Sequence, residues 1–546
     1  MTNTKKRPEV LVPAGTLEKL KVAVNYGADA VFIGGQAYGL RSRAGNFTMD
    51  ELREGIEYAH ARGVDVHVAS NMVTHEGNEK GAGEWFRELR DMGLDAVIVS
   101  DPALIEICST YAPGLNIHLS TQASATNVET FHFWKQYGLT RVVLAREVTM
   151  EELAEIRKRT DLEIEAFVHG AMCISYSGRC TLSNHMSDRD ANRGGCSQSC
   201  RWKYDLYDMP FGQERKSIHG EVPEEYSMSA VDMCMIENIP DLIDNGVDSL
   251  KIEGRMKSVH YVSTVANCYK AACDAYMESA EAFYAIKDDL INELWKVAQR
   301  ELATGFYYKT PTENEQLFGA RRKIPQYKFV GEVVDFDPAT MTATIRQRNV
   351  ILEGDHVEFY GPGFRHFECD IKDLHDANGN KIDRAPNPME LLTITVPQEV
   401  KPGDMIRSTK EGLINLYQKG RFKQNCSCLM TSQINGLLVD DQSRCQHYHS
   451  PLDIVALKCF ECQKYYACYQ CHDRLEKHSF RAYPCQLKQD KVLICGVCRH
   501  EMTIEEYQEA VACPNCHSAF NPACSKHYDI YFENKKIEDS CFNRTK

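Results

Sequence analysis

Short apolar runs alternate with longer amphipathic stretches between Pro8 and Ala285. The short runs are typical of strands buried on both faces, and the stretches between them repeat apolar residues at helical spacing. Strands are expected at residues 9–13, 30–34, 64–69, 96–100, 116–120, 141–145, 163–168 and 249–253. Helices are expected between most of them, at residues 17–26, 49–61, 84–92, 103–110 and 151–158.

Eight strands in near-regular alternation with helices imply parallel pairing. The expected fold is therefore α/β, a (β/α)8 TIM-like barrel over residues 8–325 that a helical region at residues 259–302 would close. A doubly wound open sheet is the alternative. It is less favoured because no Gly-x-Gly-x-x-Gly follows the first expected strand.

The pattern changes to β after Lys328. Strands are expected at residues 329–336, 341–346, 356–360, 390–396 and 405–408, separated by turns rich in Gly, Pro, Asp and Asn. We therefore predict a small β-barrel domain with a closing helix over residues 326–424. Its role is either RNA docking or covering of the first domain, and it contains no base-reading motif.

One loop after the seventh expected strand carries Cys173, Cys180, Cys196 and Cys200. A loop of this length with little apolar pattern is costly to order unless something ties it down. Four converging thiols are the usual ligand set of a tetrahedral zinc ion or an iron–sulfur cluster. Only the last two cysteines approach the close pairing typical of zinc, so the wider gaps favour a [4Fe–4S] cluster. Ordinary buried thiols and a disulfide pair are the alternatives.

Polar residues follow the expected strands, and in a barrel they would ring the mouth from which the cysteine loop leaves. Arginines recur among or near them, at Arg41, Arg43, Arg146, Arg193 and Arg255. Guanidinium groups bind carboxylates bidentately, so a small anionic co-substrate is expected there. His169 is a candidate acid/base or a hydrogen-bond donor beside the cluster, and a structural histidine is the alternative.

The cysteine loop and its surroundings resemble the signature of the collagenase-like U-family peptidases. The residues that carry the resemblance are Glu165-Ala-Phe167, His169-Gly170-Ala-Met-Cys173, Ser177-Gly178-Arg-Cys180, Ser183, Arg193-Gly-Gly-Cys196 and Cys200-Arg-Trp. Over residues 8–424 the chain is similar to the branch of tRNA 5-hydroxyuridine hydroxylases. The resemblance implies hydroxylation of the wobble uridine in tRNA without molecular oxygen, with a prephenate-like co-substrate and a cluster held by the four cysteines. Ser197 departs from close relatives, which often carry a further cysteine at that position.

Composition and charge indicate the expected compartment of the protein and what it binds. The 546-residue chain carries no export signal and no apolar stretch long enough to span a bilayer, so a cytoplasmic protein without membrane contact is expected. With 23 cysteines in that setting, metal ligation is favoured over disulfides. The net charge of −14 means that an RNA substrate needs a local basic patch. The candidate patches are residues 5–7, 201–203 and 321–323.

Cysteine becomes dense after residue 425, where 14 of the 23 occur. Four Cys-x2-Cys knuckles, one Cys-x-His and two further histidines supply enough ligands for three tetrahedral zinc ions. The twelve candidate ligands are Cys445, His447, Cys459, Cys462, Cys468, Cys471, His472, His478, Cys495, Cys498, Cys513 and Cys516. Such a segment is not expected to fold without its metal.

The same segment, assigned to residues 433–535, resembles the CHY-type zinc finger. The resemblance implies three sites: one of Cys445, His447, Cys468 and Cys471, one of Cys459, Cys462, His472 and His478, and one of Cys495, Cys498, Cys513 and Cys516. Cys485, Cys524 and Cys541 are left over.

Three functions are weighed. The first is a tRNA-modifying hydroxylase with an iron–sulfur cluster. The second is a collagenase-like peptidase, which the motifs do not support because neither His-Glu-x-x-His nor Gly-x-Ser-x-Gly occurs. The third is a zinc-dependent interaction or chaperone-like protein in which the tail is the working part.

Overall fold

The computed structural model describes residues 5–40, 46–205, 207–208, 216–217, 225–312, 315–318, 327–408, 434–440, 442–484, 487, 490–521 and 528–533. The chain divides into two compact units, Met1–Phe422 and Lys423–Lys546. Several features of the sequence lie outside the described residues: Arg41, Arg43, the basic run 321–323, the expected closing helix, Cys485, Cys524 and Cys541.

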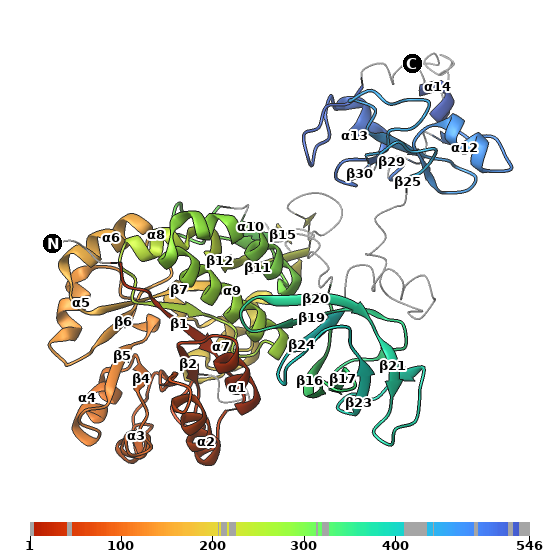
Figure 1. Ribbon diagram of the computed structural model, residues 1–546. Helices are drawn as coiled ribbons and strands as arrows, with labels where there is room; N and C mark the ends of the chain where they lie inside the picture. Colours follow the sequence, from red (N-terminus) through yellow and green to blue (C-terminus); the bar gives the residue numbers. More distant parts are fainter. Residues whose placement is uncertain are drawn as a thin grey trace, which may run out of the picture. The chain divides into compact units, whose positions relative to one another are not determined.

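Eight parallel strands form a closed barrel in the first unit, which confirms the predicted fold (Figure 1). They are β1 (Glu9–Pro13), β2 (Ala30–Ile33), β3 (Asp65–Ala69), β4 (Ala96–Val99), β5 (Asn116–Leu119), β6 (Arg141–Val143), β7 (Glu163–Gly170) and β13 (Ser249–Ile252). The ring closes through β13, where Leu250 pairs with Val10 on one side and Ala166 on the other. A short strand β12 (Asp232–Cys234) runs antiparallel to the end of β7.

Amphipathic helices surround the barrel (Figure 1). They are α1 (Leu17–Asn25), α2 (Met49–His60), α3 (Ala82–Asp91), α4 (Pro102–Tyr111), α5 (Val128–Lys135), α6 (Met150–Arg159), α8 (Ile239–Asp244), α9 (Val259–Glu278) and α10 (Ala280–Val297). Capping boxes begin α2 at Thr48 and α6 at Thr149. No helix in the described part of the chain is both long and apolar enough to cross a bilayer.

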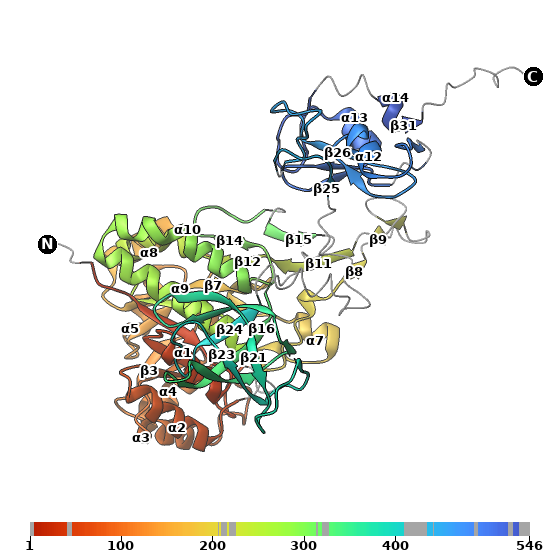
Figure 2. The ribbon, with the colours of Figure 1, turned by 45° about the vertical axis from the view of Figure 1, so that its right-hand side comes forward.

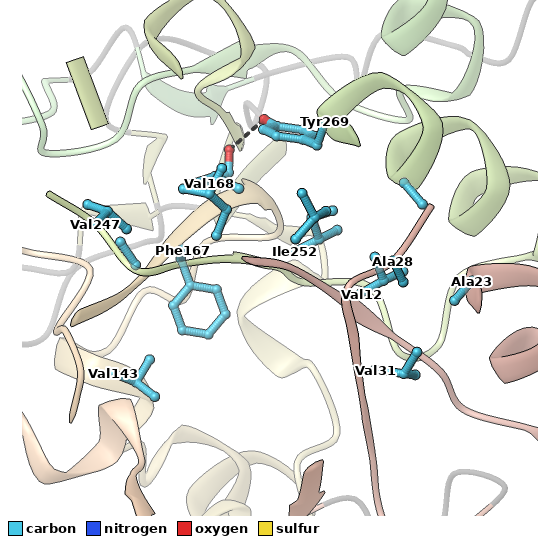
Figure 3. Packing of buried hydrophobic residues seen from close by; sticks show 14 of the residues in the cluster. Val12, Ala23, Ala28, Val31, Val143, Phe167, Val168, Val247, Ile252 and Tyr269 are labelled. Atoms are coloured by element: carbon cyan, nitrogen blue, oxygen red, sulfur yellow. Dashed lines mark hydrogen bonds between the residues drawn. The ribbon is translucent and has the colours of Figure 1, made fainter. Parts of the chain in front are cut away.

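The core lies between the strands and the helices and is built from β-branched side chains such as Val12, Val31 and Ile252 (Figure 3). Tyr269 of α9 is fully buried there and donates its hydroxyl to the carbonyl of Val168, at 2.8 Å. This bond fixes α9 to the strand from which the cysteine loop departs.

The interior of the barrel holds a buried charged layer. The Glu165 carboxylate accepts from Lys251 at 2.6 Å and from Arg141 at 3.3 Å, and Arg141 also donates to Glu9 at 2.7 Å. Each charge therefore has a partner of opposite sign, as burial requires. Glu9 and Arg141 are the first residues of β1 and β6, so the layer lies toward the amino ends of the strands, away from the mouth.

The second part of this unit is an antiparallel sheet of seven strands. In sheet order these are β20 (Arg365–Asp370), β19 (His356–Gly361), β24 (Met405–Ser408), β16 (Phe329–Asp337), β17 (Thr342–Gln347), β23 (Leu391–Thr395) and β21 (Lys372–His375). The edge strands β20 and β21 are joined through one residue, buried Ile371. Since one residue cannot cross an open sheet, the sheet must curl until its edges meet.

Buried polar contacts join the curled sheet to the barrel. Arg407 of β24 is fully buried and donates to Glu358 at 2.8 Å and to Glu293 of α10 at 2.7 Å. Tyr26 donates its hydroxyl to the carbonyl of Gly403, at 2.9 Å. These bonds cross from one part to the other, so the two parts form one body.

The second unit contains a five-stranded sheet in the order β25 (Ile434–Asn435), β27 (Tyr465–Tyr466), β26 (Val455–Lys458), β29 (Leu493–Cys495) and β30 (Glu501–Met502). Three short helices, α12 (Tyr469–Leu475), α13 (Ile504–Glu509) and α14 (Tyr528–Tyr531), and the paired strands β28 (Tyr483–Pro484) and β31 (Phe532–Glu533) also belong to this unit. Several residues of its two buried apolar clusters are themselves candidate zinc ligands, so its core depends on the ligand groups.

Candidate functional site

The cysteine loop begins where β7 ends at Gly170, at the carboxyl mouth of the barrel. Gly170 has a φ of +100°, and a Cβ there would lie 2.3 Å from the carbonyl oxygen of Glu253. Only glycine fits this turn. The loop then forms α7 (Leu182–Ser187) and the short turns η2 (Tyr176–Gly178), η3 (Ala191–Arg193) and η4 (Ser199–Arg201), and α7 projects away from the barrel strands (Figure 2).

The four thiols of the loop lie near enough to influence one another electrostatically. Burial raises the pKa of Cys200, the Arg201 guanidinium lowers it, and Cys173, Cys196 and Cys180 raise it by their charge. Cys173 and Cys196 are exposed, whereas Cys180 and Cys200 are half-buried. The four do not form one of the groups of described residues whose ligand atoms all lie within 4.8 Å of one another, as the tail clusters do.

Side chains of the barrel mouth anchor the loop. Glu147, just after β6, accepts from the backbone N–H of Ser177 at 2.8 Å and from its hydroxyl at 3.0 Å. Arg179 donates to the carbonyl of Gln122 at 2.5 Å. Asn192 donates to the carbonyl of Cys180 at 3.0 Å. Gln122 and Glu147 come just after the strands expected at residues 116–120 and 141–145, so both belong to the polar ring expected at this mouth; their contacts with the loop were not predicted.

Arg146 lies at the mouth with its guanidinium 3.7 Å from the centre of the Phe167 ring. Stacking on an aromatic face holds the guanidinium plane in place and leaves its N–H groups for a ligand. Arg255 is buried, and its side chain runs against Gly34 with Asn46 as a hydrogen-bond partner at 3.4 Å. Arg193 is exposed within the cysteine loop.

His169 is buried at the end of β7, and burial lowers its pKa to about 4. The ring is therefore neutral at pH 7. Its Nδ1 lies 3.3 Å from the Tyr269 hydroxyl, which already donates its proton to Val168. Nδ1 must then be the protonated nitrogen, and Nε2 keeps its lone pair.

Sequence reasoning did not find the histidines of the barrel interior. Nδ1 of His67 and of His118 is buried without a hydrogen-bond partner, and these rings lie within 4.8 Å of the Glu165 carboxylate. Each of these histidines is a single polar residue within an otherwise apolar buried run, in β3 and in β5, and this gives no distinctive signal. Both Glu165 oxygens are already bound by cations, so the charge here is balanced without a metal ion.

The second unit brings the twelve predicted tail ligands together in three groups of four. These are Cys445, His447, Cys468 and Cys471, then Cys459, Cys462, His472 and His478, then Cys495, Cys498, Cys513 and Cys516. Tetrahedral zinc with bonds of about 2.3 Å places ligand sulfurs about 3.8 Å apart. The Cys445–Cys468 and Cys495–Cys516 separations are 3.6 and 3.8 Å. The donor sets and spacing therefore fit zinc.

Fold and site define a class: a parallel barrel with a thiol-bearing loop at its carboxyl mouth, followed by a curled sheet and a zinc-finger unit. Residues 15–317 match the description "Peptidase family U32", residues 325–407 match its C-terminal domain, and residues 445–507 match the CHY zinc finger. The chain belongs to peptidase family U32.

Several proteins with similar sequences are named for RNA hydroxylation. "tRNA hydroxylation protein P1" of Bacillus subtilis is 48% identical over 405 residues, 74% of this chain and 96% of that protein. "tRNA hydroxylation protein P" of Haemophilus influenzae is 34% identical over 442 residues, 73% of this chain and 95% of that protein. "23S rRNA 5-hydroxycytidine C2501 synthase" of Escherichia coli is 37% identical over 278 residues, 51% of this chain and 41% of that protein.

Proposed function

We propose that this protein hydroxylates RNA, specifically the wobble uridine of tRNA at carbon 5, with a prephenate-like anionic co-substrate and without molecular oxygen. The observation that carries the proposal is the four-thiol loop at the mouth of a barrel that is 48% identical to a protein named for tRNA hydroxylation. In a TIM barrel the chemistry occurs at this mouth.

A [4Fe–4S] cluster held by Cys173, Cys180, Cys196 and Cys200 fits the donor set. The four are not among the described groups whose ligand atoms all lie within 4.8 Å of one another, unlike the zinc-type groups of the tail. The ligand sulfurs of a four-iron cluster lie further apart than those around a single zinc ion. When bound, it would supply one-electron chemistry at the mouth.

The residues of the chain would orient the substrates. Arg146 would bind a carboxylate of the co-substrate, since its guanidinium is held flat on Phe167. Arg193 is a second candidate for that role from the loop itself. His169 would accept a proton or a hydrogen bond at Nε2, because its Nδ1 is engaged with Tyr269. Buried Arg255 would shape the wall of the mouth.

Nucleoside analysis of tRNA tests the proposal. A strain that lacks this chain and every redundant enzyme should contain no 5-hydroxyuridine or nucleosides made from it. The wild-type gene should restore them, and a Cys180→Ala gene should not. Unchanged nucleosides in the deleted strain would contradict the proposal, and thiol-dependent cleavage of peptides by the purified protein would favour the peptidase alternative.

A further inference from the structure

The cysteine loop exposes an unusual number of large apolar side chains. Ile174, Tyr176, Met186 and Trp202 are 44%, 56%, 41% and 42% exposed, and all four come from this one loop. Exposed apolar side chains that occur together on one segment, rather than singly, mark candidate binding surfaces. The proposed cluster does not explain them, since its ligands are the thiols.

The backbone beneath the two aromatic rings is fixed by hydrogen bonds. Tyr176 lies next to Ser177, which Glu147 holds through two bonds of 2.8 and 3.0 Å. Trp202 donates its backbone N–H to the carbonyl of Ser199 at 3.0 Å, and Tyr204 donates to the same carbonyl at 2.7 Å. The backbone that carries the two rings is therefore already fixed, so binding a ligand costs little additional conformational entropy.

The charge of the loop is opposite to that of the whole chain. Residues 171–203 contain five Arg or Lys and two Asp or Glu, a net charge of +3, whereas the chain carries −14. Aromatic rings within a cationic segment are the combination by which proteins bind unpaired nucleotides: bases stack on the rings, and cations attract the phosphates.

We infer that Tyr176 and Trp202 are stacking platforms for the bases beside the target nucleotide, so that the RNA must reach the thiols as an unpaired strand. This inference rests on the proposed function and adds to it the residues that hold the RNA and the form of RNA they accept. A paired stem is excluded as substrate, because its bases already stack on one another and hide their faces from the rings.

Binding of a fluorescein-labelled tRNA anticodon stem-loop to the full chain tests the inference. Tyr176→Ala and Trp202→Ala should each weaken binding about tenfold, and Tyr176→Phe and Trp202→Phe should restore most of it because they keep a ring. Phe133→Ala is the matched control, since Phe133 is 48% exposed but lies on α5, outside the loop. It should bind like the wild type.

Two further readouts separate stacking from a structural role. Unlabelled RNA should quench the intrinsic tryptophan fluorescence of the wild type. It should not quench that of Trp202→Phe, although both proteins bind the RNA. The same RNA annealed to its complement should bind at least about tenfold more weakly at equal salt concentration. Alanine variants that bind like the wild type, or a duplex that binds as well as the loop, would overturn the inference. Normal binding without hydroxylated product would instead contradict the proposed function.

Discussion

At the scale of single residues, Arg146 links fold to proposed function. Its guanidinium lies 3.7 Å from the Phe167 ring centre at the mouth of the barrel. The sequence indicated an arginine there from its position after β6. It did not indicate the ring beneath it, because Arg146 follows β6 and Phe167 lies in β7, and the two meet only when these strands pair.

Arg146→Lys should raise the KM for the anionic co-substrate about tenfold or more, because a lysine neither stacks in this way nor bonds a carboxylate bidentately. Initial rates of 5-hydroxyuridine formation over a range of co-substrate concentrations give the KM. Iron content should stay unchanged. Arg159→Lys on the exposed face of α6 is the control, and an equal KM in all three proteins would remove Arg146 from the site.

Buried histidines predict how stability depends on pH. Burial lowers the pKa of His260 to about 3, against an ordinary value of 6.5. Between these values the unfolded chain binds a proton that the folded chain does not, so stability falls as the pH falls through this window. Between pH 6.5 and pH 5, one such histidine lowers the free energy of unfolding by about 2 kcal/mol.

His260→Phe should therefore narrow the difference between the melting temperatures at pH 7 and pH 5. The new ring would keep the stacking on Phe329, now at a centroid distance of 5.7 Å, but would lose the bond to the Tyr360 hydroxyl. The absolute stability at pH 7 is thus expected to fall, while its pH dependence weakens. A variant with the pH dependence of the wild type would contradict the prediction.

At the scale of elements, the cysteine loop depends on a carboxylate that is distant from it in sequence. Glu147→Ala removes both hydrogen bonds to Ser177, each of a kind that contributes about 1.5–3 kcal/mol. We expect the variant to lose bound iron several times faster than the wild type in the presence of a chelator, because the loop is released from β6. Iron release followed by absorbance checks this.

Glu151→Ala is the control for that experiment, since Glu151 is an exposed carboxylate in the first turn of the next helix, α6. It should release iron at the rate of the wild type. An equally slow release from Glu147→Ala would show that the cluster ligands alone hold the loop.

The elements also show what a sequence predicts and what it does not. The barrel strands were predictable because most of their residues are apolar and buried, as in β4 with its run Ala96–Val99. The strands β20 and β21 were missed because β20 alternates exposed and half-buried residues and carries little apolar signal. Their joining through Ile371 depends on the curvature of the whole sheet.

The candidate sites also differ in whether the sequence predicts them. The tail ligands could be named from spacing, because Cys-x2-Cys knuckles place both sulfurs on one turn. The layer of His67, His118 and Glu165 could not, since each residue comes from a different strand and a lone buried polar residue in a strand has no distinctive pattern.

At the scale of the whole molecule, the two units should respond differently to metal removal. A chelator should take about three zinc ions from the second unit and unfold it, because its small apolar clusters include several of the zinc ligands. The barrel, with its large continuous core, should stay folded. Zinc release followed by a colorimetric dye, with limited proteolysis, checks both outcomes.

Cys498→Ser is the matched variant for that experiment, because it removes one ligand from one of the three groups. It should bind about two zinc ions. Three ions in the variant, or proteolysis of the barrel at the same chelator concentration, would contradict the separation of the two units.

The central claim is that one loop holds an iron–sulfur cluster beside the mouth of the barrel. The most direct measurement is the iron and acid-labile sulfide content of the full chain purified without oxygen, with Cys180→Ala in parallel. We expect about four iron and four sulfide per wild-type chain and a large loss of both in the variant. Zinc alone, with no labile sulfide in the wild type, would contradict it.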